Sequence, residues 1–534
     1  MKILANIIRP LVTFSQLPIL AIVAISLIPL FWFEGQAING VDVDYAFFHQ
    51  DRFFARLQLW DPNFMGGTPR SNNVASLGFI LPSALLEYFG IIELNQTIFY
   101  CAIQAAIGFS FYFFMRATFG RCETKEHAIA LGAACVFYMT SFYLMFVWVR
   151  LQLGTTYLIF LPTFLGVLTL GLERKIRKSS LWALCCLLAI PSSPLGIQPP
   201  IIMIIVFFFL IYSIFQAVTS RDRNAFKEVI SVWAVASLGF VAGSLFWAIG
   251  LISFIFEAGY NDSAVGKDVY SVVPLIEWTS TILNTQNLIS FFGDIDWFGE
   301  WNGHFYFPTF VDHSLSYLGI FLPIIVFVIA IQSLNVSTET NRGLTYLFFF
   351  CYCFFLFLSK GSHPPFGFIY LWLVENLPMF WIQRAPWQKF TLISNFCFTV
   401  LLFIAIRHLL IKFAILKRLA FCVKLSPTVV ASSVFSIAVL AILANHHLYV
   451  SGKMFRSATD EKGFHGVYDL GFHHNYPEYL FDARQAFYKR GSKNILLLPI
   501  SSTNVFTWNY GAATPISVLL FDQGLFFKSY GEGM

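Results

Sequence analysis

Charged side chains are scarce in this sequence of 534 residues. Only 12% of the residues are charged, whereas 57% are hydrophobic and the mean hydropathy is +0.68. A water-soluble protein carries roughly a quarter of charged residues, so the composition excludes an ordinary soluble enzyme. Apolar runs of about 20 residues, each long enough to cross a hydrocarbon core about 30 Å thick, account for the shortage of charge.

Several common signatures are also missing. The nine cysteines lie in apolar runs or in segments expected in the cytoplasm, which excludes a disulfide framework in the outer loops. The sequence has no phosphate-cradling glycine-rich loop, no HExxH motif and no nucleophile elbow. Its basic residues follow the pattern of inner-surface anchors, so no nucleic-acid partner is predicted. The first apolar run lacks a small-residue cleavage site, which predicts a retained helix rather than a signal peptide.

The apolar runs predict an all-α polytopic membrane protein with about eleven transmembrane helices. Basic residues outnumber acids in the segments on the N-terminal side of the membrane, and acids outnumber bases in the loops on the other side. This bias predicts a multi-pass protein of the cytoplasmic (inner) membrane, with its N-terminus inside and its C-terminus outside. The runs lie near 11–33, 95–115, 128–148, 155–172, 180–197, 199–219, 229–256, 314–332, 343–358, 389–406 and 427–447.

The sequence predicts two domains, a transmembrane domain over 1–447 and an extracytoplasmic segment over 448–534. In the second, "PEYLFDARQAFYKRG" predicts a helix and "NILLLPI" a buried strand, the start of a soluble α/β segment. Because the sequence stops at "SYGEGM" without a closing element, we expect a truncated segment or half of a domain.

Two of the outer loops are predicted to hold short helices at the membrane surface. In the loop over 34–94, the spacing of apolar residues from Tyr45 to Trp60 predicts an amphipathic interfacial helix, followed by a turn at "DPNFMGG". The loop over 359–388 predicts a short interfacial or re-entrant helix between two proline-bearing turns. The basic stretch over 407–424 predicts a juxtamembrane helix in contact with anionic membrane lipids.

Acidic residues gather in two of these outer loops. Asp44 and Asp51, with Asp42 nearby, are placed to act as a general base or to bind a divalent cation such as Mg²⁺ or Mn²⁺. A solvated loop that merely carries acids is the alternative. The second group mixes acids with aromatic rings, a combination that binds sugars but is also typical of an interfacial belt; it comprises Asp294, Asp296, Trp297, Glu300, Trp301 and His304.

Cations gather near a later outer loop. Arg384 and Lys389, with His363 upstream, are expected at the outer surface of the membrane. The planar fork of arginine matches the oxygens of a phosphate, so these residues are candidates for holding a lipid phosphate. Ordinary snorkelling toward lipid headgroups is the alternative.

The loop motifs resemble those of the GT-C superfamily of membrane glycosyltransferases. The resemblance is carried by "LWDPNFMGG", by "SNNVASLGFILP", by an acid sixteen residues before Trp60, and by "LPMFWIQRAPWQKF". It is nearest to the large arabinofuranosyltransferases of the actinobacterial cell wall and looser to the YfhO-like membrane proteins. The helices between these loops agree with the family in number and order.

This resemblance implies a GT-C-like helical bundle and a polyprenyl-phosphate–sugar donor. It implies transfer, with inversion, to a glycan or glycolipid acceptor of the cell envelope on the extracytoplasmic face. Asp44 takes the place of the catalytic Asp relative to Trp60, with Asp42 beside it, and Arg384 falls on the family's R-x-P-W position. We assign Trp60 to the sugar- and acceptor-binding group.

Two other functions stay open. A transporter or lipid flippase places ionisable residues near the bilayer midplane and builds paired broken helices, whereas nearly every charge here lies at a helix end or in a loop. A non-catalytic scaffold for envelope assembly is the other possibility.

Overall fold

Long helices dominate the computed structural model, which describes residues 14–32, 37–38, 60–61, 68–69, 95–149, 154–190, 192, 199–219, 223–257, 269–289, 291, 300–301, 304–305, 326–334, 339–377, 380–419, 449–450, 473–474, 482, 486, 489–490, 494–496 and 524–526. The longer helices are α2 (Leu17–Ser26), α6 (Asn95–Phe119), α7 (Lys125–Thr140), α8 (Phe142–Val149), α9 (Gly154–Leu172), α10 (Lys178–Ala189), α11 (Pro199–Thr219), α12 (Arg223–Glu257), α14 (Val269–Ser280), α19 (Glu339–Ser359), α20 (Gly367–Asn376) and α21 (Pro386–Leu419). Short helical turns are η1 (Phe14–Gln16), η2 (Ile28–Phe31), α15 (Thr285–Ile289) and η3 (Phe380–Gln383).

The apolar helices confirm a polytopic membrane protein. In the described part of the chain, six segments are long and apolar enough to cross a membrane: Thr97–Phe119, Lys125–Trp148, Gly154–Leu172, Asn224–Leu245, Arg342–Ser359 and Pro386–Lys412. Shorter apolar helices cover Leu17–Phe31, Lys178–Ala189 and Ile204–Thr219. These nine segments match nine of the predicted runs. Of the other two, the run near 314–332 is described only from 326, where it is helical, and the run near 427–447 lies outside the described residues.

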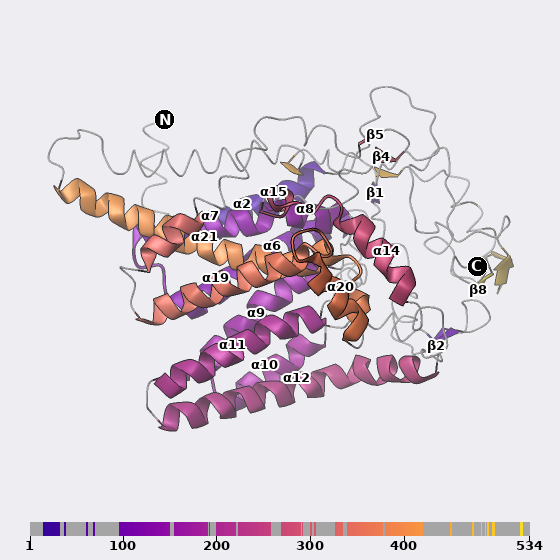
Figure 1. Cartoon of the computed structure of the whole chain (residues 1–534), viewed down its shortest axis with the longest axis horizontal. Coiled ribbons are helices and arrows are strands. Elements are labelled where there is room, and N and C mark those ends of the chain that lie inside the picture. The colour runs from indigo at the N-terminus through magenta and orange to yellow at the C-terminus, as the bar shows by residue number, and fades with distance from the viewer. Residues whose placement is uncertain are drawn as a thin grey trace.

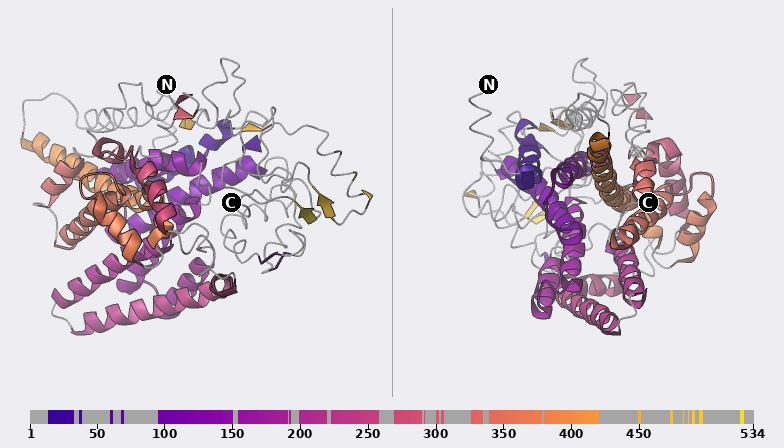
Figure 2. Two further views of the ribbon diagram at one scale, coloured as in Figure 1. Left: turned by 45° about the vertical axis from the view of Figure 1, so that its right-hand side comes forward. Right: turned by 90° about the vertical axis from the view of Figure 1, so that its left-hand side faces the viewer.

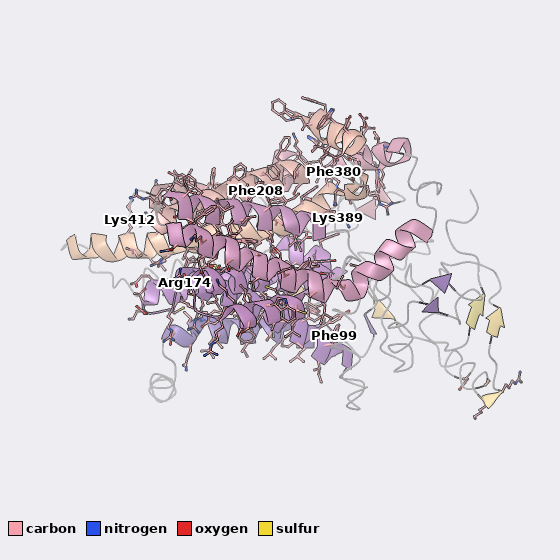
Figure 3. All side chains as sticks on the ribbon, turned by 90° about the horizontal axis from the view of Figure 1, so that it is seen from below. Phe99, Arg174, Phe208, Phe380, Lys389 and Lys412 are labelled. Atoms are coloured by element: carbon pink, nitrogen blue, oxygen red, sulfur yellow. The ribbon has the colours of Figure 1, made fainter. Side chains whose placement is uncertain are left out.

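The helices form one bundle with two chemically different ends (Figures 1 and 2). One layer holds α2, α6, α7, α19 and α21, and α9, α10, α11 and α12 pack beside it. Arg174 and Lys412 lie at one end, which we name the basic end, whereas Lys389 lies toward the other (Figure 3). The short helices α14 and α20 also lie there, and we name it the α20 end.

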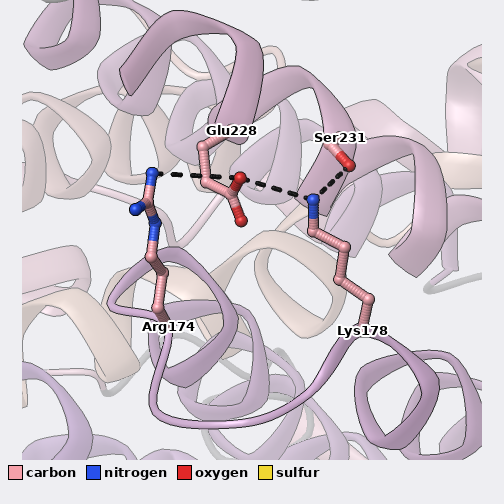
Figure 4. Close-up of polar contacts among 4 residues, drawn as sticks. All are labelled: Arg174, Lys178, Glu228 and Ser231. Carbon is pink, nitrogen blue, oxygen red and sulfur yellow. Dashed lines mark hydrogen bonds and ion pairs between the residues drawn. The ribbon is translucent and has the colours of Figure 1, made fainter. Parts of the chain in front are cut away.

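Ion pairs tie neighbouring loops together at the basic end. Glu228 lies between two cations, 3.9 Å from Arg174 and 3.3 Å from Lys178, and the Lys178 ammonium also donates to the hydroxyl of Ser231 at 2.7 Å (Figure 4). Since these side chains are largely exposed, the pairs orient the α9–α10 loop on α12 more than they stabilise the fold.

Close contact between α10 and α12 depends on two glycines. Gly239 and Gly243, four residues apart, face the backbone carbonyl groups of Trp182 and Cys186, where any added side-chain carbon would collide. Small residues at this spacing let two membrane helices approach closely, so that dispersion contacts hold them together without a hydrophobic driving force.

A proline inside α9 leaves a carbonyl oxygen free to accept a hydrogen bond from a neighbouring helix. Pro162 has no N–H, so the carbonyl group of Leu158 loses the donor that an intact helix would supply. The phenol of Tyr138 in α7 donates to that carbonyl oxygen at 2.9 Å instead. An unsatisfied carbonyl in a membrane interior is costly, so this bond fixes the register of α7 against α9.

The predicted run at 128–148 is broken at Ser141. Ser141 has an extended backbone and its hydroxyl accepts from the Leu144 N–H at 3.3 Å, which starts α8. The carbonyl oxygen of Met139, next to the break, accepts from Gln104 at 2.6 Å and from Tyr449 at 3.0 Å. Tyr449 is thus held among the helices of the bundle.

Two further predictions can be compared with the helices. The loop over 359–388 does hold a short helix, α20, between Pro364–Pro365 and Pro378. The basic stretch after 406 is not a separate helix: it continues α21, a single helix of 34 residues that ends at Leu419. The reason is that residues 387–419 contain neither proline nor glycine, so nothing interrupts the hydrogen-bonded backbone.

The described strands are short pairs. β2 (Trp60–Asp61) and β3 (Thr68–Pro69) form an antiparallel pair, and β4 (Glu300–Trp301) pairs likewise with β5 (His304–Phe305). The turn predicted between β2 and β3 lies outside the described residues. β1 (Ala37–Ile38) pairs with β6 (His473–His474) of the tail. The strand expected at "NILLLPI" is β7 (Asn494–Leu496), parallel to β8 (Gly524–Phe526); the expected helix before it is described at residues 482, 486 and 489, all helical.

Candidate functional site

The candidate site is built on the first turn of α21 at the α20 end. Pro386 is the first helical residue, where the missing N–H of proline removes no helical bond. Trp387 is 2% exposed and meets the rings of Phe146 and Tyr143 edge-on at 5.1 and 5.7 Å. The Tyr143 phenol donates to the Gln388 carbonyl oxygen at 2.8 Å. The break at Ser141 therefore turns α8 so that it supports the start of α21.

The residues before α21 are held by α20. The buried Tyr370 donates its hydroxyl to the Gln383 carbonyl oxygen at 2.6 Å. Phe380 of η3 lies between Tyr370, at 5.4 Å, and Phe390 of α21, at 6.3 Å. The chain thus approaches Arg384 along a packed aromatic surface rather than as a free loop.

The end of α14 joins this surface from a different outer loop. The Thr279 hydroxyl donates to the Arg384 carbonyl oxygen at 3.4 Å, and the buried Ser280 hydroxyl accepts from the Ser362 N–H at 3.2 Å. Gly361 has φ of +61° and its Cα faces Ser280 and Pro386 so closely that no side chain fits. Segments of the two loops 257–313 and 359–388, both predicted to lie outside, therefore meet at the backbone that presents Arg384.

Arg384 is the exposed cation of this platform. Its backbone is held by the Thr279 contact, its side chain is exposed, and no described carboxylate forms an ion pair with it. His363 is half-buried, with Nδ1 2.7 Å from the Pro364 carbonyl oxygen. When Nδ1–H donates to that oxygen, Nε2 is the ring nitrogen that this bond does not use.

Two lysines contribute positive charge from below the surface. Lys389 lies in the first turn of α21 and is 8% exposed, so it is not the exposed cation that the sequence predicts. Lys360, equally 8% exposed, donates to the Pro365 carbonyl oxygen and lies 5.2 Å from the Phe357 ring centre. Burial lowers the pKa of Lys360 from its ordinary value. We did not predict Lys360 as a site residue, although its position directly after the run 343–358 was a usable signal.

The predicted acidic residues are only partly described. Asp42, Asp44 and Asp51 of the first outer loop, and Asp294, Asp296 and Trp297 of the second, lie outside the described residues. The backbone places Trp60 in β2, Glu300 and Trp301 in β4, and His304 in β5, where Trp301 pairs with His304 across the strands. Among the described residues no three His, Cys, Asp or Glu side chains converge as a metal site would need. The divalent cation stays a prediction.

Exposed aromatic residues surround the cations. Trp278 of α14 is 47% exposed, and on and beside α20 Phe366, Phe368 and Trp372 are 58%, 69% and 55% exposed. Rings at such positions suit the boundary between headgroups and acyl chains. A cation presented among them matches a ligand with an anionic head and a long apolar tail.

The fold is similar to that of a known membrane glycosyltransferase. No protein-family profile and no curated protein sequence matches the chain. Two cryo-EM structures of the arabinofuranosyltransferase AftD from Mycobacteria, one of them a mutant, align over 97% of this chain with TM-scores of 0.56 (mutant) and 0.52 and 13% identity. The chain spans about a third of the AftD chains, 33% and 32%. These likenesses show that the chain shares its fold with the part of the AftD chains that it aligns with.

Proposed function

We propose that this chain is a membrane glycosyltransferase that moves a sugar from a polyprenyl-phosphate donor to a glycan or glycolipid acceptor of the cell envelope. In this proposal the α20 end faces outward from the cytoplasmic membrane, the N-terminus lies inside and the C-terminus outside. The fold likeness to AftD supports the reaction class. The sequence segments that include Arg174 and Lys412 carry more basic than acidic residues, and both residues lie at the opposite end (Figure 3), which supports the orientation.

The observation that carries the proposal is the presentation of Arg384. Two hydrogen bonds hold the backbone at Arg384, one to its own carbonyl oxygen and one to that of Gln383. The side chain is exposed, has aromatic rings on neighbouring elements and pairs with no described carboxylate, so it is prepared for an anionic ligand. A fork of N–H donors at the membrane surface fits the two free oxygens of a phosphodiester, and the aromatic residues suit its prenyl chain. Lys360 and Lys389 add positive potential from beneath, and His363 lies three residues after Lys360.

The proposed reaction is a single displacement at the anomeric carbon. Asp44 takes the proton from an acceptor hydroxyl, whose oxygen forms a bond to that carbon while the bond from the carbon to the phosphate oxygen breaks. The polyprenyl phosphate leaves with the electron pair, and Arg384 stabilises the charge that develops on it. Attack opposite the leaving group inverts the anomeric centre.

The remaining predicted residues are assigned to the sugar and acceptor. Trp60 follows Asp44 in the first outer loop, and the β4–β5 pair presents Glu300, Trp301 and His304, preceded by Asp294, Asp296 and Trp297. Aromatic faces stack on the apolar face of a sugar while carboxylates accept its hydroxyl protons. Asp44 and Asp51 would hold Mg²⁺ or Mn²⁺ if the reaction uses a divalent cation.

Transfer by the purified full chain in lipid nanodiscs tests the proposal. A panel of synthetic polyprenyl-phosphate sugars is supplied with oligosaccharide acceptors, and the release of polyprenyl phosphate is measured together with the anomeric configuration of the product. We expect one donor to give an inverted glycoside, and Asp44→Ala to abolish transfer while Glu87→Ala, in the same loop, retains it. Full activity of Asp44→Ala would remove this residue from the proposed role, and a retained anomeric configuration would overturn the displacement.

A further inference from the structure

A histidine and an arginine meet inside the bundle at the basic end. His127 lies in the first turn of α7, where the Thr124 hydroxyl accepts from its backbone N–H at 3.2 Å and so caps the helix. The His127 side chain is 4% exposed, and its ring lies 5.2 Å from that of Phe403 in α21. Arg407 is one helical turn farther along α21 and close enough to His127 for their charges to interact.

Both side chains have an enclosed nitrogen without a partner. Nε2 of His127 and Nε of Arg407 are buried, and neither makes a hydrogen bond to another described residue. A polar atom enclosed in this way loses its contact with water and gains nothing in exchange. Ionisable residues within membrane helices are costly and almost always have a partner. The two nitrogens therefore indicate a ligand that supplies an acceptor to each.

No described carboxylate forms an ion pair with His127 or Arg407. At the basic end Glu228 is engaged by Arg174 and Lys178 (Figure 4), and Glu173 by Lys175 at 2.6 Å. Of the other acids at this end, Glu123 and Glu126 form no ion pair with a described residue, and Glu339 begins α19, the helix that packs on α21, but its side chain lies outside the described part of the chain. The flanking segments 1–13 and 420–448 contain no Asp or Glu at all.

We propose that His127 and Arg407 bind the phosphate group of an anionic phospholipid between α7 and α21 at the basic end. The guanidinium and the imidazole each donate to a phosphate oxygen. The rings of Phe119 and Phe403, 5.1 Å apart, lie beside them as an apolar wall for the glycerol and acyl chains. Lys412, on the same part of α21, adds positive charge nearby.

Depth separates a lipid from a soluble anion as the source of this phosphate. Arg407 lies within the apolar segment Pro386–Lys412, five residues before its end. A phosphate bound to it therefore lies at the depth of the lipid headgroups, where a phospholipid already places its own phosphate. The site is also distinct from the proposed donor site, because eighteen residues of α21 between Lys389 and Arg407 span about 27 Å. A lipid bound here would hold α7 against α21 in the leaflet opposite the one that contains the proposed donor site.

Native mass spectrometry of the full chain tests this proposal without any measurement of transfer. The protein is reconstituted in nanodiscs of phosphatidylcholine with or without phosphatidylglycerol, and retained lipids are counted after release. We expect one phosphatidylglycerol to stay on the wild-type chain under conditions that strip phosphatidylcholine. Arg407→Gln should weaken this retention about tenfold or more. Arg407→Lys should keep part of the retention. Arg177→Gln, which removes an exposed arginine at the same end, should retain it fully.

Thermal unfolding keeps the test informative if retention is difficult to count. In phosphatidylcholine alone, Arg407→Gln should be at least as stable as wild type, because it removes a half-buried cation whose enclosed Nε has no described partner. Addition of phosphatidylglycerol should then raise the Tm of wild type and of Arg177→Gln, but not that of Arg407→Gln. Equal retention by Arg407→Gln and wild type, or displacement of the lipid by millimolar inorganic phosphate, would overturn the lipid assignment.

Discussion

The phenol of Tyr370 donates a 2.6 Å hydrogen bond to the carbonyl oxygen of Gln383, the residue that immediately precedes Arg384. Burial raises the pKa of the Tyr370 phenol well above its ordinary value, so the hydroxyl keeps its proton and remains a donor at any working pH. The short helix α20 thereby fixes the backbone that presents the arginine. This helix is too short to cross a membrane, and its position beside the arginine gives it a role in the site.

Replacing Tyr370 with Phe tests the positioning role of α20. Loss of one buried hydrogen bond weakens the fixed backbone by about 1 kcal/mol, so we expect donor affinity to fall about fivefold. The Tm should change little, because packing against Phe380 and Phe390 is kept. Tyr346→Phe, at a 59% exposed position on α19, is the matched control and should bind donor like wild type. Unchanged donor affinity in Tyr370→Phe would show that the bond does not position Arg384.

The break in the α7–α8 segment gives a prediction about stability. Gln104 is fully buried and bridges the Met139 carbonyl oxygen to Trp148, whose indole N–H donates to it at 3.1 Å. Gln104→Leu leaves that indole without its acceptor and the carbonyl oxygen with one donor fewer, so we expect a loss of about 2–4 kcal/mol in unfolding free energy. Tyr449→Phe removes one donor to the same carbonyl oxygen and a contact with Trp148, but it keeps both Gln104 bonds and should cost less.

Unfolding curves of both variants in nanodiscs, compared with wild type, measure this difference. Equal stability of Gln104→Leu and wild type would mean that the break at Ser141 does not depend on these bonds.

The contact between α10 and α12 gives a second prediction about stability. Gly243→Ala places a methyl group against the Cys186 carbonyl oxygen, so α12 must move away from α10. Overpacking of this kind costs about 1–3 kcal/mol. Ala234→Val adds more volume to an exposed position on the same helix and should leave the Tm unchanged. A Gly243→Ala protein that unfolds at the wild-type temperature would contradict the close approach of the two helices.

Local chemistry made much of the bundle predictable. Length and apolarity located the spanning helices, and Pro364–Pro365 on one side of residues 367–376 and Pro378 on the other indicated the separate helix α20. The continuity of α21 was missed because charges after 406 lower the hydropathy, although they do not interrupt helical hydrogen bonding.

The break at Ser141 could not be predicted because its partners are distant in sequence. "YMTSFYLMFVW" is apolar throughout, and the donors that satisfy Met139 come from Gln104 and Tyr449, 35 and 310 residues away. The burial of Lys389 likewise depends on the packing of the α21 start against its neighbours, which periodicity does not show. Of the candidate site, the cationic half is described, whereas its meeting with Asp44 stays a prediction.

The most direct test is the affinity of the full chain for a synthetic polyprenyl phosphate, measured by titration in nanodiscs for wild type, Arg384→Gln and Arg177→Gln. A hydrogen bond to a charged group contributes about 1.5–3 kcal/mol, so we expect Arg384→Gln to weaken binding about 10- to 150-fold. Arg177→Gln, an exposed change at the basic end, should bind like wild type. If Arg384→Gln binds within twofold of wild type, Arg384 does not hold the donor phosphate and the proposed site is wrong.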